Sequence, residues 1–207
     1  MARCQSKGFN RFSGRVGNVI FYKMRGEFYA RARPTEVRDC RSELQLYYRE
    51  RMRGTATFYG VVRQTLLALV WQAMGQRKDR SAYNLFVQAN IRAFNGTALL
   101  YDLVRFSSGS LTLPRDLQAC RDGNKIRLTW KNEEVVSDER LGDELWCVVM
   151  TEDKNFRIME PRETGGIRED EAAEIEIAGE EGGKVHLYCF FGSMGRDDFS
   201  ENMHFAL

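Results

Sequence analysis

Long hydrophobic segments are missing from this sequence of 207 residues. The longest apolar patch, Thr65 to Trp71, is far shorter than the roughly 18 apolar residues that a membrane-spanning helix needs. The opening residues lead into glycines and charged side chains, and not into the apolar core of a secretory signal. These absences predict a cytoplasmic protein with no signal peptide, no transmembrane segment and no membrane partner.

Histidines and closely spaced cysteines are scarce. The chain has no C-x-x-C motif and only two histidines, His186 and His204. Its five cysteines are Cys4, Cys40, Cys120, Cys147 and Cys189. An odd, scattered set is typical of reduced intracellular thiols and not of a disulfide framework. A zinc site assembled from these dispersed residues is the alternative, but we predict no metal site and no cofactor.

Sequence motifs for catalysis are also absent. There is no G-x-x-x-x-G-K-[ST] loop, and the glycine-spaced segment Ser13 to Gly17 precedes a predicted strand, so it lacks the helix dipole that binds phosphates. There is no G-x-S-x-G motif, and both histidines fall in predicted strands. The acidic pairs Glu133-Glu134 and Glu180-Glu181 lie in predicted loops, where solvation is the usual role and calcium coordination the alternative. We predict no catalytic residues and no small-molecule substrate.

The net charge of +2 hides a strong asymmetry. Residues 1–106 contain 19 Lys and Arg against 7 Asp and Glu, a net charge of +12, whereas residues 107–207 contain 12 against 22, a net charge of −10. Such a split indicates two domains, a basic one over residues 1–106 and an acidic one over residues 107–207, and favours a polyanionic partner for the first. The alternative is that the two halves attract each other, within one chain or between copies.

Aromatic and β-branched residues predict a hairpin near the N-terminus. Its strands are Asn18–Lys23 and Glu27–Arg33, joined by a turn at Gly26 and ended by Pro34. The glycine-rich segment Gly8–Gly17 before them is predicted to be a loop. Side chains alternate along a strand, so three residues share one face of the second strand. These are Tyr29, Arg31 and Arg33.

Helical periodicity begins after a capping-box pattern at Ser42–Gln45. Apolar residues then recur at steps of three and four, which predicts one inward helix face. Its members are Leu44, Tyr48, Met52, Thr55, Tyr59, Val62, Leu66, Leu69 and Ala73. Gly54 and Gly60 each disfavour helix by roughly 1 kcal/mol relative to Ala, so we expect a break or kink there. A second helix is predicted from about Ser81 to Phe94.

From Ser110 onward the apolar period changes to two. Seven short strands with no helix between them predict an antiparallel sandwich with Trp130 buried. The expected strands are Ser110–Leu113, Lys125–Trp130, Glu144–Thr151, Phe156–Met159, Ala173–Ile177, Lys184–Phe191 and Asn202–Ala206. The predicted fold class is therefore α+β, with an N-terminal β-hairpin and helices followed by a seven-stranded antiparallel β-sandwich.

Short motifs are spread along the chain at Phe12–Val19, Tyr22-Lys23, Arg31–Pro34, Ser81–Asn84 and Ser108–Leu111. Together they resemble an uncharacterised two-domain family from Bacteroidetes. Cys40 stands where that family usually has a proline. The family has no established activity, so the resemblance implies architecture only. In the second half, Leu128-Thr129-Trp130 and Tyr188 resemble the second and sixth strands of a fibronectin type III-like or immunoglobulin-like sandwich, which implies structural roles.

Arginines and tyrosines gather between residues 22 and 53, and they give the candidate binding site. Its predicted members are Tyr29, Arg31, Arg33, Arg38, Arg41, Arg49 and Arg53. Guanidinium groups bind phosphates and aromatic rings stack on bases, so a nucleic-acid-binding module is one interpretation. An arginine-rich helix exposed to solvent, or docked on an acidic protein, is the other. We expect a non-enzymatic interaction or structural protein that binds a protein partner or a second copy, with nucleic-acid binding as the alternative.

Overall fold

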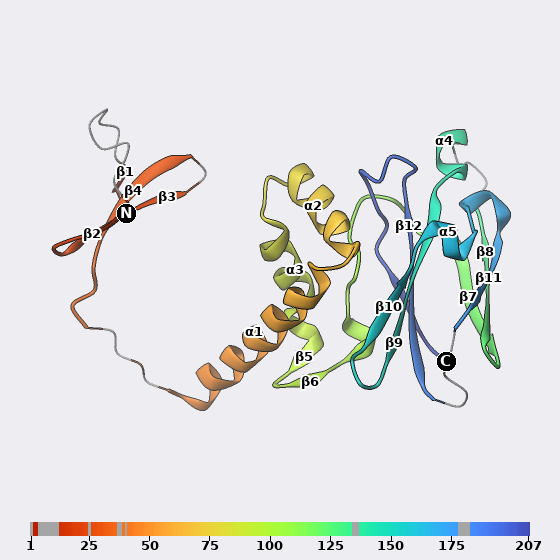
Figure 1. The fold of residues 1–207 in the computed structure, drawn as a ribbon, viewed down its shortest axis with the longest axis horizontal. Helices are drawn as coiled ribbons and strands as arrows, with labels where there is room; N and C mark the ends of the chain where they lie inside the picture. Colours follow the sequence, from red (N-terminus) through yellow and green to blue (C-terminus); the bar gives the residue numbers. More distant parts are fainter. Residues whose placement is uncertain are drawn as a thin grey trace. The chain divides into compact units, whose positions relative to one another are not determined.

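The structure, a computed structural model, describes residues 2–3, 13–24, 26–36, 39, 41–133, 137–177 and 183–207. It is α+β, with helices and antiparallel sheets, which confirms the predicted fold class (Figure 1). The chain forms two compact units, residues 1–42 and residues 43–207. The predicted boundary between residues 106 and 107 therefore falls inside the second unit.

The first unit contains a sheet of four antiparallel strands in the order β1-β4-β3-β2. The strands are β1 (Ala2–Arg3), β2 (Gly14–Val16), β3 (Val19–Met24) and β4 (Glu27–Ala32). Strands β3 and β4 confirm the predicted hairpin. The prediction of a loop over Gly8–Gly17 is wrong at residues 14–16, because Gly17, at φ 56°, allows a tight turn that pairs β2 with β3. Residues 8–12 of that loop lie outside the described residues.

Three helices begin the second unit: α1 (Glu43–Val62), α2 (Leu67–Arg77) and α3 (Ala82–Asn90). Helix α1 starts directly after Ser42, where the capping pattern predicts it. The break in the long helical pattern follows Val62 and not either glycine, so that part of the prediction is wrong. Thr65 Oγ1 donates a hydrogen bond to the Val62 carbonyl at 2.7 Å, and such local side-chain bonds compete with the helix ladder.

The predicted inward face of the long helix is correct only in its second half. Leu44, Tyr48 and Met52 are exposed, and the buried residues of α1 are Thr55, Phe58 and Val62. None of the residues from Glu43 to Arg53 is buried. The first three turns of α1 therefore continue an apolar stripe beyond the part of the helix that packs against the core.

Short elements connect the helices to the sandwich. The 3₁₀ helix η2 (Ile91–Ala93) follows α3, strands β5 (Phe94–Asn95) and β6 (Ala98–Leu99) form a small hairpin, and the 3₁₀ helix η3 (Tyr101–Leu103) comes next. Ser81 caps α3 by accepting a hydrogen bond from the Asn84 amide at 3.2 Å, so the predicted start of the second helix is confirmed.

Seven strands then form two antiparallel sheets, β10-β9-β12-β13 and β11-β8-β7. Their bounds are β7 (Arg115–Asp122), β8 (Lys125–Lys131), β9 (Glu144–Thr151), β10 (Phe156–Met159), β11 (Ala172–Glu176), β12 (Val185–Gly192) and β13 (Met203–Ala206). Six of them coincide with predicted strands to within about two residues. The prediction of a strand at Ser110–Leu113 is wrong, since Leu111 makes only a single bridge, to Ser200.

Little of strand β7 is apolar, so the apolar pattern of the sequence does not predict it. It lies at the edge of its sheet, and of its eight residues only Leu117 is buried. The prediction of a sandwich without helices is also wrong, although the helices found there are only about one turn long. The connections hold α4 (Asp138–Leu141), α5 (Pro161–Thr164) and the 3₁₀ helix η4 (Arg168–Asp170).

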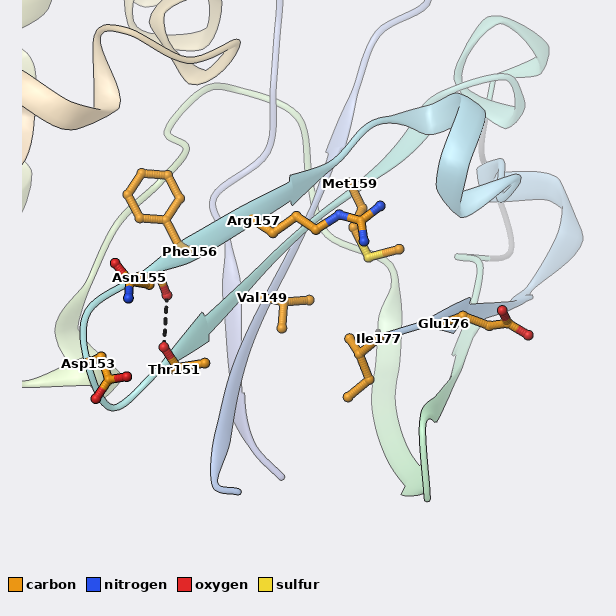
Figure 2. A pocket seen from close by; sticks show the side chains of 9 residues that line it. All are labelled: Val149, Thr151, Asp153, Asn155, Phe156, Arg157, Met159, Glu176 and Ile177. Carbon is orange, nitrogen blue, oxygen red and sulfur yellow. Dashed lines mark hydrogen bonds between the residues drawn. The ribbon is translucent and has the colours of Figure 1, made fainter. Parts of the chain in front are cut away.

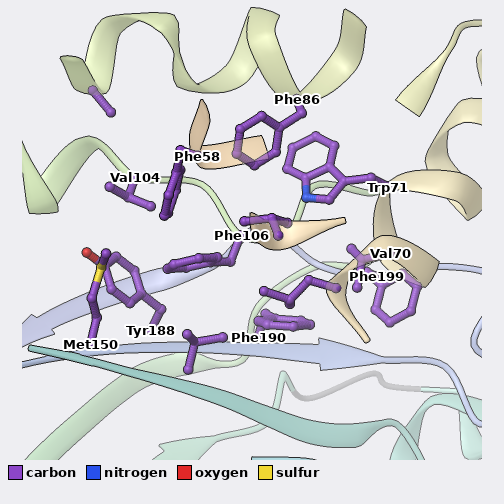
Figure 3. Packing of buried hydrophobic residues seen from close by; sticks show 14 of the residues in the cluster. Phe58, Val70, Trp71, Phe86, Val104, Phe106, Met150, Tyr188, Phe190 and Phe199 are labelled. Carbon is purple, nitrogen blue, oxygen red and sulfur yellow. The ribbon is translucent and has the colours of Figure 1, made fainter. Parts of the chain in front are cut away.

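The sheet β10-β9-β12-β13 is covered on both sides. One face packs against the other sheet, and this core includes Trp130, 3% exposed, as predicted. The opposite face packs against the helices in a second core rich in aromatic rings (Figure 3). Residues that alternate along β9 divide between these cores, Cys147 and Val149 in the first and Trp146 and Val148 in the second. Helices 43–93 and the sandwich therefore share one continuous packing arrangement within the second unit.

No helix in the part of the chain that the structure describes is long and apolar enough to cross a membrane.

Candidate interaction surfaces

The predicted binding residues of the first unit lie on or beside β4. Tyr29 is half-buried and Arg31 and Arg33 are exposed. Tyr29 pairs directly with Tyr22 of β3, and the two rings stack with centroids 5.7 Å apart. Arg31 pairs with Ile20, which in turn pairs with Arg15 of β2. Because directly opposed residues point to the same side of a sheet, this face carries two arginines beside a tyrosine pair.

Two further predicted residues follow this sheet in the chain. Arg38 lies outside the described residues. Arg41 is exposed and forms an ion pair with Asp39, with Nε 3.6 Å from the carboxylate oxygen. The Arg41 side chain is 78% exposed in this pair. An exposed ion pair of this kind contributes little to stability.

The opposite face of the N-terminal sheet is apolar. By strand alternation it carries Val16, Val19, Phe21, Phe28, Ala30 and Ala32, with Lys23 as its only charged residue among the described ones. Val16 is 62% exposed. None of residues 13–24, 26–36, 39, 41 and 42 is buried. A sheet of this size normally needs a covered hydrophobic face to be stable, and its described residues carry apolar side chains on one face without a fully buried one among them.

Arg49 and Arg53, the remaining predicted residues, are exposed on α1 in the second unit. Arg51, which lies between them, has a structural role. Its Nε and Nη2 donate hydrogen bonds to the Ile91 carbonyl at 3.0 and 2.7 Å, and its guanidinium lies 5.4 Å from the ring centre of Tyr47. The three arginines therefore differ in role: Arg51 binds the first residue of η2, whereas Arg49 and Arg53 are exposed to solvent.

Arg53 also lines an apolar groove of ≈ 370 Å³ that the sequence did not reveal. One wall is a single face of α1, and the other is built from the β5–β6 hairpin and the start of β10. The lining residues are Glu50, Arg53, Gly54, Thr57, Phe58, Val61, Phe94, Thr97, Leu99, Lys154 and Phe156. The two walls lie far apart in sequence. The spacing of the α1 residues, at steps of three and four, predicts that they share one helix face, but not that a hairpin packs beside it.

A second hollow of ≈ 330 Å³ lies at the open side of the sandwich, between β9–β10 and the end of β11 (Figure 2). Val149, Met159 and Ile177 supply apolar surface, and Arg157 and Glu176 supply charge. Arg157 Nη2 already donates a hydrogen bond to Glu163 at 2.6 Å. The hollow is therefore lined by charges of both signs, and its guanidinium, that of Arg157, is already bound to Glu163.

The two histidines, distant in sequence, meet on the helix-facing side of the sheet. His186 Nδ1 and His204 Nε2 lie 2.9 Å apart and share one hydrogen bond. The Tyr101 ring stacks on His186 with centroids 3.9 Å apart and planes at 2°. Burial lowers the pKa of both histidines. Strand alternation assigns each histidine to one face of its strand, but nothing in the sequence predicts that Tyr101 of η3 stacks on His186.

The charged residues buried in the sandwich have structural partners. Arg168 and Asp143 form an ion pair at 3.2 Å, and Arg168 Nη2 donates a hydrogen bond to the Thr112 carbonyl at 2.6 Å. Burial raises the pKa of Asp143 and lowers that of Arg168. Among the described residues, no group of three or more His, Cys, Asp and Glu side chains is placed to hold a metal ion.

The structure describes three of the five cysteines, and all three are free thiols. Cys120 is exposed, whereas Cys147 and Cys189 are buried with their sulfur atoms 3.6 Å apart. The reduced state of all five cysteines stays a prediction, which thiol titration of the denatured, non-reduced protein tests, and a Cys147–Cys189 bridge would contradict it. Burial raises the pKa of Cys189 well above its usual range, which favours the protonated thiol. Cys4 and Cys40 lie outside the described residues.

Comparisons with known proteins add a family and no activity. A family model described as "Family of unknown function (DUF6266)" matches residues 11–203. A search of curated proteins found no match, and a search of solved structures found none.

Proposed function

This chain belongs to the DUF6266 family, a family of unknown function, and we propose that it is a non-enzymatic interaction protein whose N-terminal sheet contacts a second copy of the chain. One observation carries the proposal: the sheet of residues 14–32 has an apolar face and no buried residue among those described. Burying such a face against another surface removes apolar area from water, which is the main favourable contribution to association.

Charge favours a second copy as the partner. Residues 1–42 contain ten Lys and Arg against three Asp and Glu, whereas residues 107–207 carry a net charge of −10. Opposite charges speed association and fix the register of an interface more than they add affinity. The apolar face would then supply the affinity, and the basic unit of one copy would be guided to the acidic sandwich of another.

Two adjacent substitutions on β3 test this proposal. Val19 lies on the apolar face and Ile20 on the opposite face, because successive strand residues alternate. We expect the wild type to self-associate in sedimentation equilibrium, Val19→Lys to weaken the association about tenfold, and Ile20→Lys to change it by much less. A wild type that stays monomeric at every concentration, or equal effects of the two substitutions, would contradict the proposal.

The stacked tyrosines favour a second candidate function, nucleic-acid binding. Tyr22 and Tyr29 share a face with Arg15 and Arg31, and aromatic rings beside guanidinium groups suit bases and phosphates. Binding to arbitrary DNA or RNA would be strongly salt-dependent, and removing both arginines would reduce the salt slope by about two. Micromolar or tighter binding at physiological salt would favour this function over self-association.

We also infer a fibronectin type III-like fold for the sandwich. If the seven strands are lettered A to G in chain order from β7, one sheet has the order E-B-A and the other D-C-F-G. In immunoglobulin constant domains strand D pairs with E, whereas here the fourth strand, β10, pairs with β9. Trp130, buried in the core between the two sheets, supports the same inference, whereas the buried Tyr188 packs on the opposite, helix-facing side of its sheet. A bacterial origin, suggested by the motif resemblance, stands as a proposal beside it.

A further inference from the structure

The groove beside α1 has the form of a peptide-binding site. Its α1 wall runs from Glu50 to Val61, so the groove follows the helix for about 16 Å. The floor is aromatic: the Phe58 ring lies 6.0 Å from that of Phe94 and 5.9 Å from that of Phe156. Val61, 50% exposed, ends the apolar strip. A strip of this length holds two or three turns of a helix or a short extended segment.

Glycine shapes the helical wall. A Cβ atom at Gly54 would lie 2.8 Å from the Phe94 ring, so only glycine lets the ring approach the helix axis this closely. The approach brings the β5–β6 hairpin against α1 and sets the groove between them. The position of this wall therefore depends on the close approach of the Phe94 ring to Gly54.

The charged residues at the rim are mainly basic. Arg53 from α1 and Lys154 from the β9–β10 turn are both exposed, and the lining of the groove contains one carboxylate, Glu50. Lys154 Nζ donates one hydrogen bond to the Thr97 carbonyl at 3.0 Å, which holds the amine at the rim. An ammonium group has three donors, so Lys154 retains capacity for a ligand.

We propose that this groove binds a segment of a partner protein that carries large apolar side chains flanked by carboxylates. The apolar side chains would lie on Phe58, Phe94 and Phe156, and the carboxylates would meet Arg53 and Lys154. The proposal rests on the proposed function, because it takes the molecule to be an interaction protein. It assigns the contact to a surface of the second unit, separate from the N-terminal sheet.

The test is a selection of random peptides displayed on phage against the full chain. Enriched peptides are synthesised and their affinities measured by fluorescence anisotropy. We expect peptides with net negative charge and at least one Phe, Trp or Leu. Their affinity for the double variant R53E/K154E should fall by about tenfold or more. The matched control R162E/K184E reverses two exposed cations of the sandwich outside the groove and should leave the affinity unchanged.

A second pair of variants tests the apolar contact. Val61→Ser removes an exposed apolar side chain at the groove, and Leu69→Ser removes one of similar exposure on α2, at 50% and 42%. Val61→Ser should weaken peptide binding severalfold, and Leu69→Ser should leave it unchanged.

Three results would overturn the proposal: failure to enrich any peptide, enrichment of basic peptides, or equal affinity for wild type and R53E/K154E. Sedimentation of the wild type and of Val19→Lys reports on the N-terminal sheet, whereas the peptide affinities report on the groove. A wild type that stays monomeric at every concentration but binds the enriched peptides through Arg53 and Lys154 would reject the proposed function and leave the groove standing.

Discussion

The hydrogen bond between His186 and His204 links protonation to folding, because one ring nitrogen must remain unprotonated to accept it. Burial is the largest cause of the lowered pKa of each ring. Nearby charges act in both directions. Glu152 raises the pKa of His186 and Lys184 lowers it, while Asp102 raises the pKa of His204 and His186 lowers it. The folded chain therefore binds fewer protons at these rings than the unfolded chain.

We expect this pair to destabilise the protein as it is acidified. Since the folded pKa values lie below the ordinary value of 6.5, the stabilisation is present above that pH and is lost as the pH falls through the folded values. Urea unfolding at about pH 7.5 and about pH 5.5 should show a larger loss of stability for the wild type than for H186N/H204N. The idea is wrong if both proteins lose the same amount.

At the scale of elements, helix α1 contains two glycines with opposite roles. Gly54 lies against the Phe94 ring, whereas nothing lies within 4 Å of a Cβ atom built at Gly60. From the sequence both predict the same weakness in the helix, because each lacks a side chain and adds backbone freedom. The difference arises only from the β5–β6 hairpin, which folds back onto one of them.

The two glycines predict opposite effects of alanine. Gly60→Ala should stabilise the protein by up to about 1 kcal/mol through helix propensity. Gly54→Ala should destabilise it, because displacing a packed aromatic ring costs roughly 1–3 kcal/mol, which exceeds the same gain in propensity. Chemical denaturation measures both. If Gly54→Ala instead stabilises the protein, the prediction is wrong, because the Phe94 ring can then shift without a loss of folding free energy.

At the scale of the whole molecule, the helices and the sandwich depend on the same sheet. Trp146, Val148, Met150, Tyr188 and Phe190 are fully buried on its helix-facing side. Figure 3 shows several of these residues packed beneath Phe58, Phe86 and Phe106. Removing the helices would expose this aromatic surface to water.

We therefore expect residues 107–207 alone not to fold as a stable monomer, although the charge asymmetry marks them as a domain. A truncated chain of residues 43–207 should unfold cooperatively, whereas the shorter one should aggregate or bind a dye specific for exposed apolar surface. Circular dichroism and thermal unfolding of the two chains provide the comparison. A cooperative transition in the shorter chain, at the temperature of the longer one, would contradict this expectation and support a domain boundary at residue 106.

Local chemistry explains which parts of the fold the sequence predicted. Strands β9 and β10 match their predictions residue for residue, because apolar residues confined to short runs between turn signals leave few alternatives. The start of α3 follows from Ser81, which caps the Asn84 amide, since a cap acts within one turn, and α1 starts directly after the Ser42–Gln45 pattern begins. The candidate basic residues are also exposed where the structure describes them, as arginine hydration favours.

Tertiary structure decided the rest, because it depends on which distant segments meet. Periodicity gave α1 one apolar face, but only packing shows that Thr55, Phe58 and Val62 are covered while Leu44, Tyr48 and Met52 are not. Alternation placed the histidines on a strand face, and only the fold brings Tyr101 onto them. The groove and the doubly covered sheet both arise from contacts between residues far apart in the chain. Burial is a property of such contacts, and no local pattern records it.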